Sequence, residues 1–282
     1  MKLAKSKVIV CGIVRDAESG LRANIPVINS FCKLCGDYKV VLFENDSKDG
    51  TKRLLKEWAK ESTGHVVAMC SDTDGSLTIP RSHEVKANRF FCRQRIEKMA
   101  RLRNHYLDYI ESKGWDADYL MVVDLDVAQL FLDGILSSFR GGVEWDAVTA
   151  FGYSTSPRLK LRYHDTYALT KWGEEDIPQT EAMIIQYADE LGKLKATDEW
   201  VRVYSGFGGL AIYRFEAIKG LRYSVLANND PQVEVHSEHV GLCKSMIDNG
   251  FNRVYINPMM RLQYQRVTIK IILDSIFRKF SH

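Results

Sequence analysis

The segment Asp118-Tyr-Leu-Met-Val-Val-Asp-Leu-Asp126 constrains the fold more than any other stretch of the sequence. Residues 119–123 form a short, continuous apolar run, which is typical of a strand buried on both faces of a mostly parallel sheet. Asp124 and Asp126 follow it, and side chains two apart on a strand point to the same side. The segment therefore predicts a central strand that carries two carboxylates to the ligand-binding edge of an open α/β sheet.

The two aspartates have two interpretations. Two anionic oxygen donors on one face are costly to bury unpaired, and a divalent cation is the usual relief. A cation held by so few protein oxygens keeps coordination positions open for a diphosphate. Alternatively, Asp126 caps a helix that begins after it, and Asp124 pairs with a lysine or arginine. The motif alone leaves both interpretations open.

Length and composition are those of an ordinary globular protein. The 282 residues suffice for one large α/β domain, with 45% hydrophobic and 27% charged residues. The net charge of +3 does not indicate a nucleic-acid partner. The sequence contains no apolar run long enough for a membrane span, and its start lacks a signal-peptide pattern, so a cytoplasmic location is the expectation. Cys32 and Cys35 have metal-site spacing but no completing pair, and we interpret them as packing residues.

Apolar periodicity predicts alternating strands and helices in the first half. We expect strands over residues 7–14, 38–43 and 65–70, with helices through 21–31 and 52–61 between them. This order is typical of a parallel sheet with right-handed crossovers. A loop over 71–91 and a helix over 92–111 follow, and Arg103 falls within the apolar face of that helix. A cation there either pairs with a buried carboxylate or faces a ligand.

The second half shows weaker patterns. A short helix at 135–139 and a strand at 146–150 follow the aspartates, and residues 174–197 are helix-prone. Residues 203–213 are expected to form one strand interrupted by glycines, where the backbone comes close to another group. A helix beginning near Glu238 precedes a last strand at 254–256. Residues 266–282 predict an amphipathic basic helix that docks on the domain or contacts a membrane surface.

Several motifs, taken in order, resemble those of GT-A glycosyltransferases. They are Glu44-Asn-Asp-Ser-Lys-Asp-Gly-Thr51, Arg103-Asn104, Asp124-Leu-Asp126, Ser205-Gly-Phe-Gly-Gly209 and Ser237-Glu-His239. Finer details resemble the cryptococcal capsule-associated mannosyltransferase family, which has a similar Arg-Ile-x-x-x-Ala-x-x-Arg-Asn helix, here Arg95–Asn104. This chain differs from that family in its complete Asp-x-Asp and in the histidine after Glu238.

The resemblance implies a single α/β domain of the GT-A, Rossmann-like type over residues 1–265, with a mixed, mostly parallel sheet flanked by helices. Residues 7–127 would form its nucleotide-binding half and residues 128–265 its acceptor-side half. The implied reaction moves a sugar from a UDP- or GDP-sugar donor to a glycan, glycolipid or glycoprotein hydroxyl. The implied cofactor is Mn²⁺ or Mg²⁺, because the diphosphate leaving group needs a cation.

The resemblance also implies roles on the donor side. Asp126 would coordinate the cation, and Asp124 would hold the cation or the ribose. Arg103 would neutralise phosphate or orient Asp124. The acidic turn after the second strand would approach the base and ribose, and two glycines would let the backbone pass close to the donor sugar. The donor-binding residues so implied are Arg15, Glu44, Asp46, Arg103, Asp124, Gly208 and Gly209.

On the acceptor side, Glu238 is the candidate base for the acceptor hydroxyl, kept ionised by its helix start. The alternative is a first-turn carboxylate that only stabilises the helix. His239 or His236 could instead be the base, or a further metal ligand. Asp165 could bind a sugar hydroxyl. Nearby aromatic side chains could stack on sugar rings or simply pack; they are Tyr163, Tyr167 and Trp172.

Two other functions compete with glycosyl transfer. A nucleotidyltransferase also uses a carboxylate-bound cation, but that class usually carries a glycine-rich phosphate loop after its first strand. Cys11-Gly-Ile-Val-Arg15 is not such a loop. A non-catalytic nucleotide-sugar-binding protein on the same scaffold is the third hypothesis, and turnover of a donor would eliminate it.

Overall fold

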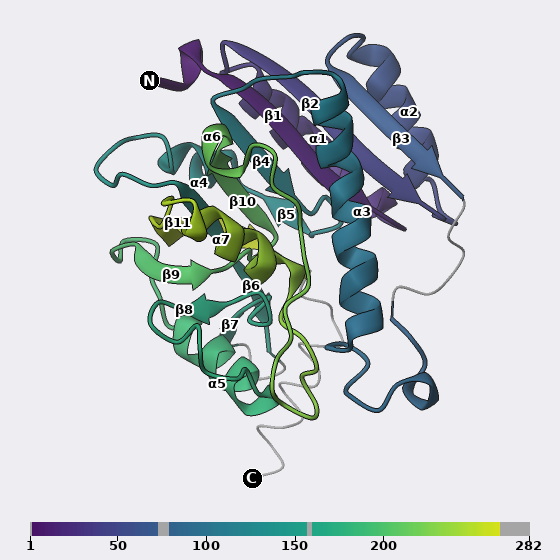
Figure 1. Ribbon diagram of the computed structural model, residues 1–282. Helices are drawn as coiled ribbons and strands as arrows, with labels where there is room; N and C mark the ends of the chain where they lie inside the picture. Colours follow the sequence, from purple (N-terminus) through teal and green to yellow (C-terminus); the bar gives the residue numbers. More distant parts are fainter. Residues whose placement is uncertain (1, 73–78, 157–159, 266–282) are drawn as a thin grey trace, which may run out of the picture.

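Four parallel strands form one side of the central sheet in the computed structural model, which describes residues 2–72, 79–156 and 160–265 (Figure 1). In spatial order they are β3 (Val66–Ser71), β2 (Asp37–Asn45), β1 (Lys7–Val14) and β4 (Tyr119–Val123). Each neighbouring pair is parallel, as the strand–helix order predicts. The predicted helix over 266–282 lies outside the described residues.

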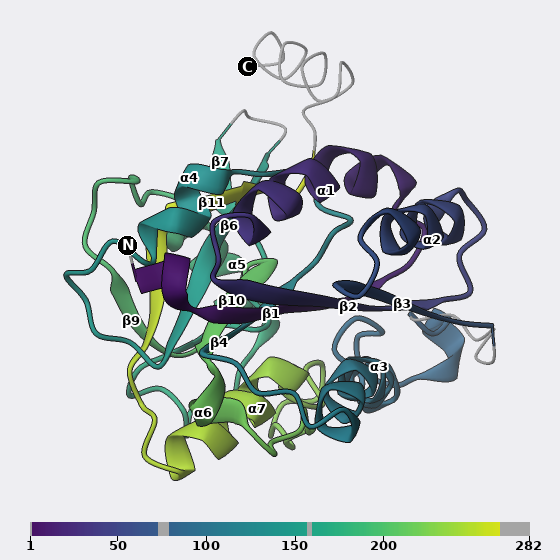
Figure 2. The ribbon, with the colours of Figure 1, turned by 90° about the horizontal axis from the view of Figure 1, so that it is seen from above.

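Helices cover both faces of this half (Figure 2). α1 (Glu18–Cys32) and α2 (Thr51–Glu61) lie on one face and bury apolar side chains such as Leu21 and Trp58 against the sheet. α3 (Arg93–Ser112) lies on the other face and buries Tyr106 and Ile110 in a second core layer. The spacing of these side chains follows the helical period, so the sequence determines which face each helix turns to the sheet.

The second half extends the same sheet beyond β4. β10 (Leu210–Arg214) runs antiparallel between β4 and β6 (Ala147–Thr155), followed by β11 (Val254–Gln263), β9 (Val201–Ser205) and β8 (Thr170–Lys171). The short strands β5 (Gln129–Leu130) and β7 (Leu161–Tyr163) pair with β11 and β6. Since β3, β2, β1, β4, β6 and β11 share one direction, the expected mixed, mostly parallel sheet is confirmed.

Shorter helices complete the domain. They are η1 (Lys2–Lys5), η2 (Ser82–Glu84), α4 (Leu132–Ser137), α5 (Glu181–Leu191), α6 (Phe215–Ile218) and α7 (Glu238–Asp248). α6 and α7 lie on the same face as α3, and α4 lies on the face of α1 (Figure 2). Within the described residues, no helix is long and apolar enough to cross a membrane.

The expected single strand over 203–213 is wrong. β9 ends at Ser205 and β10 begins at Leu210, and the two occupy separate places in the sheet. Gly208 and Gly209 between them adopt positive φ angles of 62° and 89°, which turn the chain out of an extended path. The glycines thus separate two strands instead of interrupting one.

Candidate active site

Asp124 follows the last residue of β4, and its backbone N–H donates to the carbonyl of Gly209 at 2.9 Å. The predicted pairing with an arginine is confirmed, because Arg103 Nη2 lies 3.5 Å from Asp124 Oδ1. The Tyr264 hydroxyl donates to Asp124 Oδ2 at 3.0 Å. No helix begins directly after Asp126, since β5 intervenes before α4, and the helix-cap interpretation of Asp126 is therefore wrong.

Asp124 and Asp126 lie on the wall of a cavity of about 490 Å³. The start of α3, the segment around Asp165, Phe207 and the start of α7 form its other walls. Asp126 is exposed at this opening, whereas Asp124 is half-buried. Burial raises the pKa of Asp124 to about 7, against the opposing effect of Arg103. Although the Asp126 side chain is open to the cavity, the protein around it still removes part of the water from its carboxyl and raises its pKa.

Arg103 joins the aspartate edge to the start of α7. Its Nε donates to Glu238 Oε1 at 2.8 Å, and both side chains are buried. Its guanidinium also lies 4.9 Å from the centre of the Phe207 ring. Arg103 thus forms a buried ion pair with a carboxylate, which is one of the two interpretations that its position on the apolar face of α3 left open.

Glu238 stays ionised in this pair. Burial acts to raise the pKa of Glu238, but it is lowered nevertheless, because the charged Arg103 donates a hydrogen bond to its carboxylate. His239 stacks on Phe207 with ring centres 4.0 Å apart, and burial lowers the pKa of His239 to about 3. Its ring is therefore neutral near pH 7, and neither ring nitrogen has a hydrogen-bond partner.

Asp165 reaches the same cavity from the loop after β7. Its backbone has a φ of 66°, a conformation that a non-glycine residue rarely adopts. Burial raises the pKa of Asp165 to about 8, and the negative charges of Asp124 and Glu238 add to this effect. The structure thus brings Asp165 to the two carboxylates that the sequence places elsewhere in the chain.

The three aromatic candidates and His236 have different positions. Tyr167 lines the cavity and donates its hydroxyl to the carbonyl of Val235 at 2.6 Å. Tyr163 is buried against Phe151, and Trp172 lies under the guanidinium of Arg202 at 3.7 Å. His236 is absent from the residues that line the cavity, so its role as a base or metal ligand stays a prediction.

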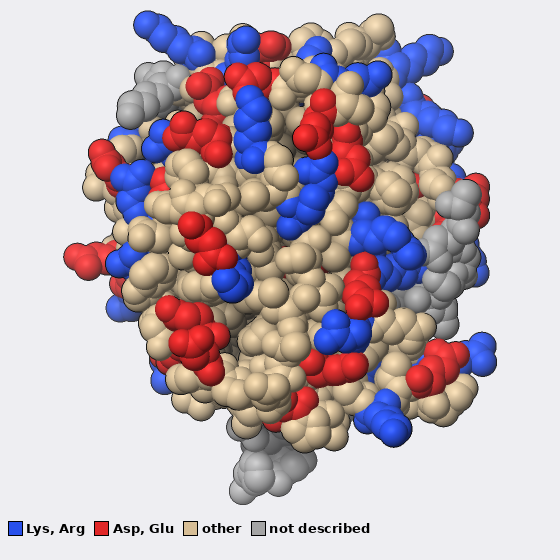
Figure 3. All heavy atoms as spheres, in the orientation of Figure 1, with Lys and Arg blue, Asp and Glu red and all other residues tan. Residues whose placement is uncertain are grey.

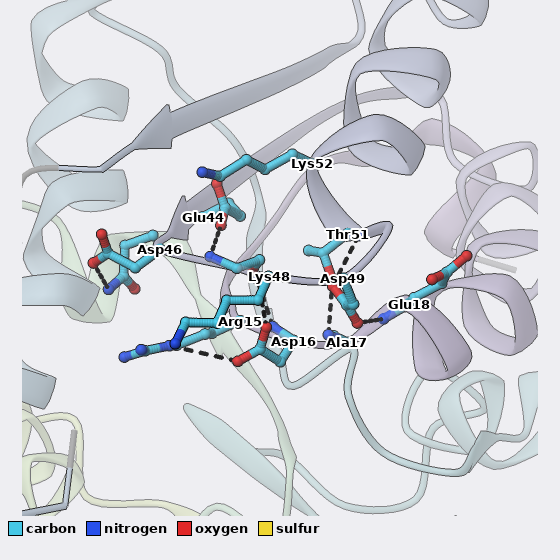
Figure 4. Close-up of polar contacts among 12 residues, drawn as sticks. Arg15, Asp16, Ala17, Glu18, Glu44, Asp46, Lys48, Asp49, Thr51 and Lys52 are labelled. Atoms are coloured by element: carbon cyan, nitrogen blue, oxygen red, sulfur yellow. Dashed lines mark hydrogen bonds and ion pairs between the residues drawn. The ribbon is translucent and has the colours of Figure 1, made fainter. Parts of the chain in front are cut away.

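The donor candidates lie at the carboxyl ends of β1 and β2: Arg15 and Asp46 follow these strands, and Glu44 is the second-last residue of β2 (Figure 4). Glu44 is fully buried, and its Oε1 accepts from the backbone N–H of Ser47 at 2.8 Å while Oε2 has no partner. Asp46 adopts a φ of 54° beside it. Arg15 is half-buried and lies 3.7 Å from the carboxylate of its neighbour.

Reciprocal hydrogen bonds join these two loops (Figure 4). The N–H of Lys48 donates to Asp16 Oδ1 at 2.7 Å, and the N–H of Ala17 donates to Thr51 Oγ1 at 2.8 Å. The N–H of Glu18 donates to Asp49 Oδ2 at 2.9 Å. The acidic turn therefore holds the carboxyl ends of β1 and β2 in one rigid platform, next to the strand that carries the aspartates.

Gly208 and Gly209 make close approaches within the protein. A Cβ on Gly208 would lie 2.3 Å from the carbonyl oxygen of Ala150, and one on Gly209 would lie 3.0 Å from the ring of Tyr264. The close approach expected for these glycines is thus made to β6 and to Tyr264. Their role next to a donor sugar stays a prediction.

Sequence reasoning missed several residues of the cavity. Tyr264 contacts Asp124 although 140 residues separate them, and its ring stacks on His164 at 3.5 Å. Arg95 also lines the cavity, yet the sequence marked it only as part of a motif. No local sequence pattern predicts contacts between residues so far apart in the chain, because these contacts depend on where β11 and β7 end in the folded structure. The Asn104 of the same motif is structural: its Nδ2 donates to the carbonyl of Tyr223 at 3.0 Å.

The donor set fits a cation that arrives with a nucleotide. No group of three or more His, Cys, Asp or Glu side chains in the described ranges is arranged to hold a metal ion by itself. Asp124 and Asp126 supply hard carboxylate oxygens at the cavity wall. Mg²⁺-type cations are commonly bound by one or two carboxylates together with substrate phosphates, so two aspartates suffice for this kind of site.

Several solved structures are similar to the chain. The mannosyltransferase PcManGT from Pyrobaculum calidifontis, in complex with GDP-Man and Mn²⁺, shares 12% identity at a TM-score of 0.49, over 99% of this chain and 65% of that one. GalNAc-T7 with UDP, GalNAc and Mn²⁺ shares 13% sequence identity at a TM-score of 0.47, and the match covers 96% of this chain and 47% of that one. The Mycobacterium tuberculosis glucosyl-3-phosphoglycerate synthase with phosphoglyceric acid shares 14% sequence identity at a TM-score of 0.44, and the match covers 99% of this chain and 80% of that one. The chain thus spans less than two thirds of the length of the first two.

Sequence comparison gives a more specific result. No curated protein matches the chain. The sequence profile described as Cryptococcal mannosyltransferase 1 matches residues 7–244, which include the platform loops, Arg103, both aspartates and Glu238. Because this match spans most of the chain, the protein belongs to the Cryptococcal mannosyltransferase 1 family.

Proposed function

We propose that the protein is a metal-dependent glycosyltransferase that moves a sugar from a nucleotide-sugar donor to a hydroxyl of a glycan or glycoconjugate. The observation that carries this proposal is the pair of aspartates at the end of β4, on the wall of a 490 Å³ cavity that also contains Asp165 and Glu238. Family membership supports it. The family name makes GDP-mannose the first donor to test, with UDP-sugars as the alternative.

Asp126 and Asp124 would hold the cation. Bound there, Mn²⁺ or Mg²⁺ supplies charge neutralisation for the diphosphate leaving group. Arg103 keeps Asp124 oriented, since it binds that carboxylate and Glu238 at once. The platform formed by the loops after β1 and β2 would bind the nucleoside, with Asp46 as an acceptor for its N–H and O–H groups, while the buried Glu44 would hold the turn through the N–H of Ser47.

Two carboxylates are candidates for the base that takes the acceptor proton. Glu238 is ionised, but one of its oxygens already accepts from Arg103. Asp165 has a pKa of about 8 as a result of burial, which is close to the pH at which a general base works best. We therefore propose Asp165 as the base, with Glu238 holding Arg103 in place. The alternative retains Glu238 as the base, with neutral His239 beside it.

A thermal-shift screen of nucleotide sugars with and without Mn²⁺ tests the donor proposal, followed by a transfer assay. Binding to the folded state raises the melting temperature by mass action. Asp126→Asn should remove the Mn²⁺-dependent part of the shift and lower transfer by about 100-fold or more, because a few kcal/mol of transition-state stabilisation is lost. The unfolding free energy should change little, since Asp126 is exposed.

Asp116→Asn is the matched control, because Asp116 is an exposed aspartate that pairs with Lys219 across 3.0 Å at the surface, away from the cavity. It should leave donor binding and transfer at the wild-type level. Near-full transfer by the Asp126→Asn variant would disprove the metal role. Donor binding without turnover against a broad acceptor panel would favour a non-catalytic binding protein instead.

A further inference from the structure

Arg95 is the second arginine that α3 presents to the cavity. Arg95, Met99 and Arg103 follow at one helical turn each, and all three line it. Arg103 is compensated by two carboxylates. In contrast, Arg95 donates through Nη1 to the carbonyl of Phe90 at 3.0 Å, and its buried Nε has no hydrogen-bond partner. No carboxylate in the described ranges forms an ion pair with Arg95, although its charge acts on Asp165 in the same cavity and opposes the rise in the pKa of that carboxyl.

The position of Arg95 separates it from the aspartate edge. Eight residues of α-helix span about 12 Å, so Arg95 lies that far along the axis from Arg103, which contacts Asp124. The start of α3 also lies beside residues 228–234, because Arg93 N–H donates to Glu234 Oε2 at 2.8 Å. The nucleoside platform lies at the ends of β1 and β2. The end of the cavity beside Arg95 is therefore distant from both the proposed cation site and the nucleoside platform, which leaves it for the acceptor.

The surroundings of Arg95 favour a ligand of opposite charge. Phe90, Phe91 and Tyr167 line this end of the cavity, and the rings of Phe91 and Tyr167 have centres 4.6 Å apart. Next to such apolar groups a charged hydrogen bond is stronger than in water, and a donor left unused is costly. A guanidinium offers a planar fork that matches the two oxygens of a carboxylate or a phosphate.

We propose that Arg95 binds a carboxylate or phosphate group of the acceptor, so that the enzyme selects a negatively charged acceptor. This inference rests on the proposed function, because it assigns the end of the cavity that the donor leaves free. Arg95 is a specificity-determining residue in this proposal. It takes no part in the proton transfer, which Asp165 or Glu238 performs.

Two matched pairs of sugars test the charge preference in titrations of the protein loaded with GDP and Mn²⁺. Methyl glucuronide is compared with methyl glucoside, and mannose 6-phosphate with mannose. The wild type should bind the charged member of at least one pair about tenfold more tightly, the gain expected for a charge-assisted hydrogen bond. Which pair shows it distinguishes a carboxylate from a phosphate. Arg95→Gln should abolish the preference.

Arg93→Gln is the control variant, since it makes the same charge change on the same helix at a residue that pairs with Glu97 and lies outside the cavity lining. It should keep the preference. If Arg95→Gln does not fold, Arg95→Met, which keeps the length and apolar stem of the side chain, replaces it. The proposal is overturned if the wild type binds both members of each pair equally.

Loss of GDP·Mn²⁺ affinity in the Arg95→Gln variant would overturn it as well, because Arg95 would then contact the donor diphosphate. The same titrations without nucleotide separate this proposal from the proposed function. A wild type that fails to bind any nucleotide sugar, yet prefers the charged sugars through Arg95, would refute the donor assignment alone. Tight donor binding without a charge preference would refute only the role of Arg95.

Discussion

Arg103 connects the two parts of the candidate site at the scale of single residues. It contacts Asp124 and Glu238 from a buried position, so its removal leaves both carboxylates without the guanidinium that neutralises them. Arg103→Gln should lower the unfolding free energy by about 3–5 kcal/mol, the usual cost of breaking a buried ion pair from one side. Urea denaturation of the two proteins measures the difference.

The double variant Arg103→Gln with Glu238→Gln tests the cause. It should lose less stability than the sum of the single variants, with a coupling energy of about 1 kcal/mol or more. Arg222→Gln is the control, because Arg222 pairs with the exposed carboxylates of Asp108 and Glu111, and its substitution should cost less than about 1 kcal/mol. Additive losses would mean that Arg103 and Glu238 do not stabilise one another.

Among the described residues, three aspartates adopt the left-handed backbone region, namely Asp16, Asp46 and Asp165. Asp16 and Asp46 lie in the two platform loops, and Asp165 lies in the cavity. Aspartate tolerates this region better than most residues, yet the conformation still costs energy unless neighbours enforce it. Strain therefore gathers at the loops proposed to bind donor and acceptor, which is where positioning of side chains matters most.

At the scale of elements, α1 fixes the turn that carries Asp126. Gly20 lies in the first turns of α1, and a Cβ added there would be 2.3 Å from the carbonyl oxygen of Leu125 and 2.8 Å from the Cα of Asp126. Gly20→Ala should therefore lower the unfolding free energy by about 1–3 kcal/mol through overpacking. Because the turn must shift, it should also reduce transfer and Mn²⁺-dependent donor binding.

Whether Gly20→Ala lowers or raises the unfolding free energy distinguishes overpacking from helix propensity. Helix propensity alone predicts that alanine in place of a helical glycine stabilises the fold by about 0.5–1 kcal/mol. Thermal and urea unfolding of Gly20→Ala would show which effect is larger. A more stable variant with wild-type transfer would mean that α1 can move away from the aspartate turn at no cost.

Elements with a strong local pattern could be predicted from the sequence. β1 to β4 and α1 to α3 follow apolar periodicity, and their observed bounds agree with the expected ones within a few residues. The region 203–213 could not be predicted in the same way, since one apolar run with glycines fits one strand as well as two. The place of β10 between β4 and β6 depends on pairing across the whole chain.

For the candidate site, too, only residues with a local sequence signal could be predicted. Asp124, Asp126 and Arg103 carry local signals, because charged groups interrupt apolar patterns there. Tyr264 and Arg95 carry none. Their roles arise when the end of β11 and the start of α3 meet at one cavity, from positions more than 100 residues apart. Sequence reasoning therefore found the acidic edge of the site together with Arg103 and Tyr167, and missed Tyr264 and the exposure of Arg95 to the cavity.

At the scale of the whole molecule, charges of both signs are mixed on the face shown in Figure 3. Lysine and arginine alternate with aspartate and glutamate over the face in Figure 3, without one large basic area. Charge of both signs also enters the cavity, where Asp124 and Asp165 have raised pKa values while His239 has a lowered one. Global stability should therefore respond to pH through these buried groups more than through the surface.

The unfolding free energy should fall between pH 6.5 and pH 8. The pKa of Asp165 is about 8 in the folded protein against 3.8 as its ordinary value, and that of Asp124 is about 7. Over this window the folded state binds more protons than the unfolded state, so stability decreases as pH rises. Buried histidines such as His239, with lowered pKa values, act in the opposite direction only below about pH 6.5.

Urea denaturation at pH 6.5, 7.25 and 8 measures this fall, which should reach about 1–2 kcal/mol for one carboxylate that titrates near pH 8. Asp165→Asn should remove that part of it, because the amide does not titrate, and the variant should exceed the wild type in stability at pH 8. Asp116→Asn should keep the wild-type slope, since Asp116 is exposed. A wild type whose stability rises across this window would mean that Asp165 is ionised throughout, and its pKa would then no longer favour it over Glu238 as the proton acceptor.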